Sequence, residues 1–169
     1  MSELNIPDYR LRVNLGSAEG TVLPYHYRQY VTGFIYKTLD NISPDKGKVL
    51  HDRGYFEDNR YKFFSHGLVA VEPRFSKDGL SSKSNRWMLW FSTADCQLLG
   101  LMEKSLALLS TISIGDTVFT IESVDKLPLR SKGGKFRCIS PISVSIDGKY
   151  LPPKDACYDA ILKSALVNR

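Results

Sequence analysis

Apolar residues recur at three- and four-residue intervals in two long segments of the chain, which is the pattern of an amphipathic helix. The first segment runs from about residue 25 to 39 and the second from about residue 94 to 109. In the first, Tyr36 lies off the apolar stripe. Ahead of the second, Thr93 and Asp95 are residues that favour helix N-caps. The pattern therefore predicts two helices that each bury one face.

Four other segments have the alternating or apolar character of strands. They are residues 9–15, 63–72, 87–92 and 117–124. In the first of them Arg10 and Arg12 alternate with apolar residues, so both arginines are expected on the face turned away from the core. The predicted order is strand, helix, strand, strand, helix, strand. This is the order of a ferredoxin-like fold of the α+β class, in which two helices cover one face of an antiparallel sheet, as in RNA-recognition domains.

The predicted ferredoxin-like domain spans residues 1–130, and residues 131–169 form a second region. In that region we expect a connecting strand over residues 136–146 and a helix over residues 155–167. Together they look like the start of a second, incomplete ferredoxin-like half. The sequence leaves open whether the chain is a fragment or a natural one-domain form.

Chemistry-bearing residues concentrate between the first helix and the second strand. Pro44 follows Ser43, which suits the start of a short second helix, and Gly54 can end it. This places His51 in the last turn of the short helix, beside the end of the helix that carries Tyr36. A basic loop follows, and its cationic side chains are Arg53, Arg60 and Lys62. Tyrosine, histidine and lysine together indicate acid–base chemistry on a phosphate.

The segments that carry these residues resemble a known family. Residues 33–36 (GFIY) and 49–52 (VLHD), followed by an aromatic strand, resemble the start of the CRISPR-associated repeat-processing endoribonucleases of the RAMP superfamily. Residues 135–144 (KFRCISPISV) resemble the connecting strand of that family. The resemblance implies an enzyme that cuts CRISPR precursor RNA within each repeat. The implied reaction is attack by a ribose 2′-hydroxyl, which leaves a 2′,3′-cyclic phosphate and a 5′-hydroxyl without a metal ion or cofactor.

By the same resemblance, His51 corresponds to the catalytic histidine of the family, Tyr36 to its helix tyrosine and Lys62 to its lysine. We expect His51 to act as general base or acid, Lys62 to stabilise charge and Tyr36 to orient the RNA. The family lysine follows its histidine more closely than Lys62 follows His51, so Arg60 or Arg53 remains an alternative. The other two histidines of the chain, His26 and His66, are rival candidates.

The formal net charge of +5 indicates a polyanionic partner because the basic residues are clustered. Lys132, Lys135 and Arg137 lie close together, and with Arg53 and Arg60 they are the predicted RNA-binding residues. A second basic group flanks a predicted Ser/Gly-rich loop over residues 74–86. Either group is alternatively an ordinary solvated surface.

Several classes of protein are disfavoured by composition. No segment has the roughly 18 consecutive apolar residues of a membrane helix, and the first ten residues do not resemble an export signal, so we expect a cytoplasmic protein without membrane contact. The three cysteines are widely spaced, which argues against disulfides or zinc and favours small buried groups. The acidic residues Asp52, Glu57 and Asp58 lie close in sequence, but we expect them to be solvated rather than to bind metal.

The expected partners are CRISPR repeat RNA and a CRISPR effector complex, and a homodimer is left open. One alternative is an RNA-binding subunit that does not cleave. Another is a regulatory ferredoxin-like domain without nucleic acid, in which the same residues are merely core and surface of an ordinary α+β domain. The first predicts repeat-RNA binding without cleavage, and the second predicts no salt-sensitive affinity for RNA.

Overall fold

The computed structural model describes residues 7–43, 64–129, 144–146 and 149–167. The chain separates into two compact units, Met1–Gly134 and Lys135–Arg169. The described residues form an α+β structure of three helices and antiparallel sheets.

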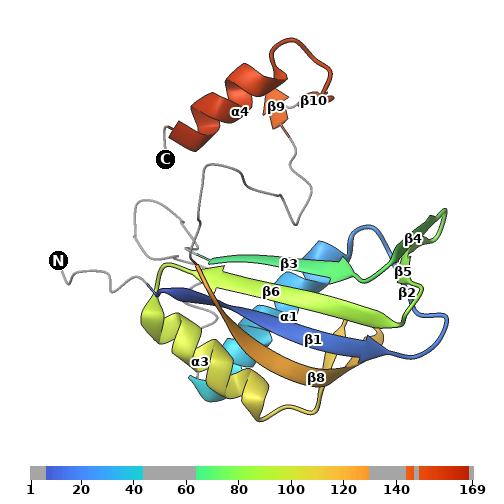
Figure 1. Ribbon diagram of the computed structural model, residues 1–169, viewed down its shortest axis with the longest axis vertical. Helices are drawn as coiled ribbons and strands as arrows, with labels where there is room; N and C mark the ends of the chain where they lie inside the picture. The colour runs from blue at the N-terminus through green and yellow to red at the C-terminus, as the bar shows by residue number, and fades with distance from the viewer. Residues whose placement is uncertain (1–6, 44–63, 130–143, 147–148, 168–169) are drawn as a thin grey trace. The chain divides into compact units, whose positions relative to one another are not determined.

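The first unit is built on a five-stranded sheet in the order β3-β6-β1-β8-β7, with all neighbours antiparallel (Figure 1). Its strands, in chain order, are β1 (Tyr9–Ser17), β3 (Phe64–Ala70), β6 (Arg86–Thr93), β7 (Thr111–Ile114) and β8 (Thr117–Pro128). Four of these correspond to predicted strands. The fifth, β7, was not predicted, and it pairs with β8 through the turn that contains Gly115.

Two helices of this unit, α1 (Tyr27–Ile42) and α3 (Cys96–Ala107), share one core with the sheet. The helix α3 begins at Asp95, whose carboxylate accepts hydrogen bonds from the backbone N–H groups of Gln97 (2.8 Å) and Leu98 (3.2 Å). This satisfies two of the N–H groups that a helix start leaves without partners. The predicted cap is therefore confirmed at Asp95.

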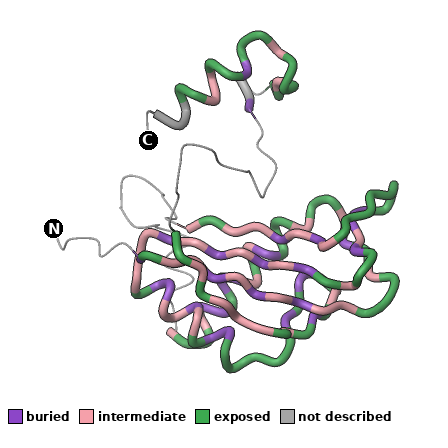
Figure 2. Tube along the Cα trace, in the orientation of Figure 1, coloured by how far each residue is buried: buried purple, intermediate pink, exposed green. Residues whose placement is uncertain are grey.

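One face of each central strand forms the core, as the alternating burial in Figure 2 shows. On β1 the side chains of Leu11, Val13 and Leu15 have no solvent exposure. On β6 the core face begins with Trp87, which is 1% exposed and donates an indole hydrogen bond to Ser17 Oγ at 3.1 Å. The opposite face of the sheet carries Arg10 and Arg12, as the alternation predicted.

Two strands of a smaller three-stranded sheet occupy the segment that was expected to be a loop. It has the order β2-β5-β4 and consists of β2 (Val22–Leu23), β4 (Pro73–Ser76) and β5 (Gly79–Ser82). The prediction of a loop over residues 74–86 was wrong, because the β4–β5 hairpin pairs with β2 from a distant part of the chain. Figure 1 shows this hairpin projecting beyond the end of the five-stranded sheet.

Several details of side-chain burial differ from the helical-stripe prediction. Tyr36, expected off the apolar stripe, is 8% exposed, whereas Tyr30, expected on it, is 36% exposed. Neither described cysteine is buried: Cys96 is intermediate and Cys157 is exposed. The cysteines therefore do not all act as small core residues.

In the second unit the described residues form a two-stranded sheet and one helix. The strands β9 (Val144–Ile146) and β10 (Lys149–Leu151) pair antiparallel, and the helix α4 spans Tyr158–Val167. Asp155 accepts a hydrogen bond from the backbone N–H of Cys157 (2.9 Å), just ahead of the helix. The strand predicted over residues 136–146 has only its end, β9, within the described residues.

Candidate functional site

Tyr36 is the predicted catalytic residue whose surroundings the structure describes. It lies on α1 and is buried, and its ring meets the ring of Phe64 edge-on with centroids 5.8 Å apart. The remaining predicted site residues lie outside the described residues. They are His51, Arg53, Arg60, Lys62, Lys132, Lys135 and Arg137.

Aromatic side chains hold the ring of Tyr36 between α1 and the sheet. Phe64, the first residue of β3, also stacks on Phe91 of β6 at 5.7 Å between centroids. Phe91 is 2% exposed, so this row of rings joins the core directly to Tyr36. Because tightly packed rings leave few alternative rotamers, the position of the tyrosine on α1 is fixed by the core.

His66 of β3 is a half-buried structural histidine rather than an exposed acid–base group. Its Nε2 lies 2.9 Å from Thr32 Oγ1, and the Thr32 hydroxyl donates its proton to the Arg28 carbonyl at 3.0 Å. Because the hydroxyl proton of Thr32 is used in that hydrogen bond, Thr32 Oγ1 acts as the acceptor toward His66. His66 therefore carries its proton on Nε2 and donates it to Thr32. Burial, assisted by the nearby charge of Arg28, lowers the pKa of His66 to about 4. At neutral pH the imidazole is therefore uncharged and is a poor proton donor.

His26, the other described histidine, stands just before α1. It is exposed, and its Nε2 lies 3.0 Å from the Tyr30 hydroxyl. The two rings are tilted with centroids 5.3 Å apart. No carboxylate hydrogen bond orients this imidazole within the described residues, so it lacks the usual partner of a catalytic histidine.

Away from the helices, the sheet presents an arginine–tryptophan contact. The Arg10 guanidinium lies 4.5 Å from the ring centroid of Trp90, and that of Arg12 lies 5.9 Å from it. Arg12 and Trp90 are paired residues of β1 and β6. Guanidinium groups at such distances are attracted to the negative face of the indole. The contact places two cationic side chains around one aromatic ring on the open face.

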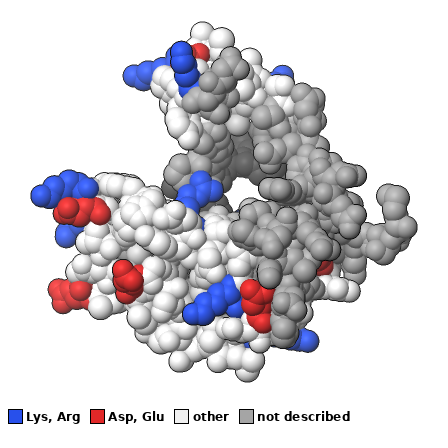
Figure 3. Space-filling model, turned by 180° about the vertical axis from the view of Figure 1, so that it is seen from behind, with Lys and Arg blue, Asp and Glu red and all other residues white. Residues whose placement is uncertain are grey.

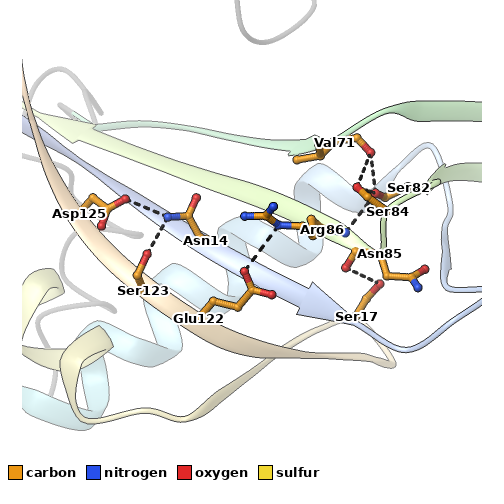
Figure 4. A network of polar contacts seen from close by, with 10 residues as sticks. All are labelled: Asn14, Ser17, Val71, Ser82, Ser84, Asn85, Arg86, Glu122, Ser123 and Asp125. Carbon is orange, nitrogen blue, oxygen red and sulfur yellow. Dashed lines mark hydrogen bonds and ion pairs between the residues drawn. The ribbon is translucent and has the colours of Figure 1, made fainter.

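A polar network beside this contact ties β1 to β8 (Figure 4). Arg12 donates to Asp125 from Nη2 at 2.7 Å and from Nε at 3.2 Å. Asn14 donates to Ser123 Oγ at 2.7 Å and to Asp125 Oδ2 at 2.8 Å. The hydrogen bond from Arg12 lowers the pKa of the Asp125 carboxyl below its ordinary value, with Asn14 adding to the effect. The network therefore keeps Asp125 ionised and the arginine in place.

A second charged pair lies further along the same face. Arg86 Nε is 3.8 Å from Glu122 Oε2, and both side chains are largely exposed. With Arg12 neutralised by Asp125 and Arg86 facing Glu122, the charge on this face is mostly balanced. Arg10 has no ion pair with any described residue. Among the described residues, Arg10 is therefore an unbalanced positive charge on the sheet face that carries Trp90.

The described residues give no sign of a metal centre. Within them, no group of three or more His, Cys, Asp or Glu side chains could hold a metal ion. The acidic trio Asp52, Glu57 and Asp58 lies outside the described residues. A search of the same part of the chain finds no helix with the length and hydropathy needed to cross a membrane.

Comparison with known proteins decides the family. Residues 22–125 match the family model described as "CRISPR-associated protein Cas6, N-terminal", which is more than half of the chain. The chain belongs to the Cas6 family. The matched residues include Tyr36, His51 and Lys62 but stop before the basic cluster at residues 132–137. The family resemblance in the sequence is thereby confirmed.

A curated Cas6 relative matches over much of this chain. It is "CRISPR-associated endoribonuclease Cas6 1" from Methanocaldococcus jannaschii, which is 24% identical over 134 residues. The match covers 79% of this chain and 51% of the relative. The chain therefore spans about half the length of the curated relative that it matches.

Three solved structures share the fold at low sequence identity. "CRISPR associated protein Cas6" has a TM-score of 0.65 at 20% identity, and the match covers 95% of this chain and 72% of that one. "An RAMP protein binding different RNA substrates" has a TM-score of 0.71 at 18% identity, with 95% and 69% covered. A Cas6-related protein from Pyrococcus furiosus has a TM-score of 0.70 at 18% identity, with 95% and 68% covered. These likenesses establish a Cas6-like and RAMP-like fold.

Sequence reasoning placed Arg10 and Arg12 on the open face of this Cas6-family fold but missed their partners. Asp125 lies 113 residues beyond Arg12. The register between β1 and β8 also shifts at Asn14/Leu15, so alternation alone cannot align the two strands. The sequence did contain an indication of these partners. Ser123 and Asp125 are polar and two residues apart in a β-rich run, so both are expected on the same face of the strand.

Proposed function

We propose that this protein is a Cas6-type endoribonuclease that binds CRISPR repeat RNA and cleaves the precursor. The observation that carries the proposal is the family match over residues 22–125, which contains the tyrosine, histidine and lysine singled out from the sequence. The curated relative is named as a CRISPR-associated endoribonuclease, which is consistent with the proposal.

The proposed reaction is metal-independent attack of a ribose 2′-hydroxyl on the adjacent phosphate. The protein must remove a proton from the nucleophile, supply one to the departing 5′-oxygen and neutralise charge on the phosphate oxygens. We assign the proton transfer to His51, because imidazole ordinarily titrates near neutral pH. Lys62, or alternatively Arg60 or Arg53, neutralises the phosphate, and Tyr36 orients it.

The environment of Tyr36 supports its part in this assignment. Its ring packs against Phe64, and Lys62 stands two residues before Phe64 in the sequence. The segment with His51 also begins shortly after α1, the helix that carries Tyr36. Chain connectivity therefore favours a site that combines the three residues. The half-buried, neutral state of His66 argues against this rival as the general acid.

We infer a ferredoxin-like arrangement for the first unit. The order β1-α1-β3-β6-α3-β8, with β1 and β6 central, is that of a ferredoxin-like domain, and β7 is an added edge strand. The β9–β10 hairpin and α4 are consistent with the start of a second such half. Residues 1–130 and 131–169 are the proposed domains.

The decisive test is incubation with RNA that contains the CRISPR repeat of the source genome, in excess EDTA, using the protein at its full natural length. We expect cleavage within the repeat, with a 2′,3′-cyclic phosphate and a 5′-hydroxyl at the new ends. End-group analysis with a phosphatase and a kinase distinguishes these products. Loss of cleavage in EDTA, or a 3′-hydroxyl product, contradicts the mechanism, whereas tight binding without cleavage supports a non-cleaving subunit of an effector complex.

Neutralising the basic cluster should weaken RNA binding. Replacement of Lys132, Lys135 and Arg137 with glutamine is expected to lower the affinity for RNA of any sequence. The plot of log affinity against log salt should become shallower by about 2, since each single-strand phosphate contact contributes roughly 0.7 to the slope. The measurement is a filter-binding titration at several salt concentrations.

A matched control removes equal charge from exposed helix positions. Lys37→Gln, Lys104→Gln and Lys163→Gln together alter α1, α3 and α4 at exposed lysines. If the control flattens the salt dependence as much as the cluster substitution does, the effect reflects net charge, and residues 132–137 are not the RNA contact.

A further inference from the structure

The β4–β5 hairpin exposes an aromatic ring that the core does not use. Leu23, Leu80 and Phe75 occupy one cross-strand row of the small sheet, since β5 pairs with β2 on one side and with β4 on the other. Leu23 is 1% exposed and Leu80 is 7% exposed, but Phe75 is 73% exposed. Leu23 and Leu80 are part of the hydrophobic core, whereas Phe75 on the outer strand β4 lies outside it.

A second exposed aromatic residue contacts the hairpin next to Phe75. The Tyr25 hydroxyl donates to the carbonyl oxygen of Ser76 at 2.7 Å, which places Tyr25 next to the residue that follows Phe75. The side chain of Tyr25 is 56% exposed. Two exposed rings from separate segments therefore lie close together at one end of the first unit, where the hairpin projects in Figure 1.

The hairpin is held in a fixed position rather than attached by its strand pairing alone. Gly79 has φ +147°, and a Cβ built on it would lie 2.0 Å from the Leu23 carbonyl oxygen. The Gly79 backbone thus lies closer to β2 than a residue with a Cβ atom could lie. The turn is also closed by Ser76, whose Oγ accepts from Asp78 N–H (3.2 Å) and donates to the Gly79 carbonyl (3.3 Å). The backbone that carries Phe75 is therefore held in a defined conformation.

The hairpin and the residue that follows it also carry exposed cationic side chains. Arg74, Lys77 and Lys83 are exposed, and none of them forms an ion pair with a described residue. Glu72 and Asp78 are also exposed nearby, so the net charge of the hairpin is only slightly positive. Figure 3 shows basic and acidic side chains next to one another at the edge of the first unit that carries the hairpin. Lys77 follows Phe75 by two residues and lies in the turn at the tip of the hairpin.

We propose that Phe75 and Tyr25 form a stacking site for bases of single-stranded RNA, with Lys77 contacting the adjoining phosphate. Exposed aromatic rings with unpaired basic side chains are the elements by which proteins hold single strands without reading their sequence. A protein partner fits less well, because the surroundings of the ring are charged rather than apolar. The inference rests on the proposed RNA-binding function and adds a contact remote in sequence from His51.

The test is the affinity of the Phe75→Ala variant, in the protein at its full natural length, for the repeat RNA. Loss of one base–aromatic stack is expected to weaken binding by about five- to 140-fold, the equivalent of roughly 1–3 kcal/mol. Phe75→Trp should keep the affinity, whereas Phe75→Leu should lose it, because leucine supplies apolar surface but no π-face. Lys77→Gln should reduce the salt slope by about 0.7.

Leu108→Ala is the matched control, because Leu108 is 82% exposed at the end of α3. It should bind RNA as the parent does. If the parent binds and Phe75→Ala or Phe75→Leu binds equally well, the stacking site is wrong while the proposed function stands. If the parent itself shows no affinity for repeat RNA, the proposed function fails, and this inference fails with it.

Discussion

Replacing His51 with alanine is expected to reduce the rate of repeat cleavage by about a hundred- to ten-thousand-fold while leaving RNA affinity nearly unchanged. Loss of one positioned acid–base group costs a factor of this size, because the proton transfers then fall to water. The proposed ground-state contacts with the RNA are basic and aromatic groups, which the substitution leaves in place. The measurement is single-turnover cleavage at saturating protein, with affinity determined separately, in the protein at its full natural length.

Tyr36→Phe should cost less than His51→Ala, since an orienting hydroxyl contributes less than a proton carrier. The phenyl ring keeps the edge-on contact with Phe64, so the variant should fold normally. His26→Ala is the control for removal of an exposed histidine. If His51→Ala cleaves at the parental rate while His26→Ala or His66→Ala does not, the assignment of the site is wrong even though the family is right.

The elements that could be predicted from the sequence are those whose burial pattern is contained within one segment. The strand β1 alternates buried and intermediate positions from Arg10 to Gly16, and α3 carries a regular apolar stripe with a capping Asp95. Short strands give no such pattern. In β5 the sequence is GLSS, and it becomes a strand only because β2 and β4 supply its hydrogen-bond partners.

Helix burial was predicted correctly only where the helix faces the sheet. Val31, Ile35 and Leu39 are buried as the stripe predicted. Tyr36 lies off the stripe, yet it is buried because Phe64 of β3 covers it, and no periodicity within α1 reveals that neighbour. Tyr30 illustrates the opposite case, since its ring lies over the turn at Gly115 and stays partly exposed.

The candidate site depended more on resemblance than on physical pattern. A lone histidine has no spacing that identifies a catalytic role, and His51 was singled out because residues 49–52 resemble a family segment. The pairing of Arg12 with Asp125 could not be predicted, because it depends on the register between distant strands and on the irregularity at Asn14/Leu15. His66 could be assessed only from its burial and its hydrogen bond to Thr32.

Replacing Trp87 with alanine is expected to lower the free energy of unfolding of the first unit by about 3–5 kcal/mol, as for other fully buried aromatic residues. Trp87 is 1% exposed, its ring meets Phe119 edge-on with centroids 5.6 Å apart, and its indole N–H donates to Ser17 Oγ. Alanine would leave a cavity in the centre of the core and remove the donor to Ser17. Urea unfolding followed by far-ultraviolet circular dichroism measures the loss.

Trp90→Ala is the matched control, because it removes the same side chain from the same strand. Trp90 lies three residues further along β6 and so projects from the opposite face, where it contacts Arg10 and is only partly buried. Loss of a cation–π contact and of part of the apolar area should cost about 1–2 kcal/mol. Equal destabilisation by the two substitutions would mean that both faces of β6 are covered alike, and would contradict a sheet with helices on one face and an open surface on the other.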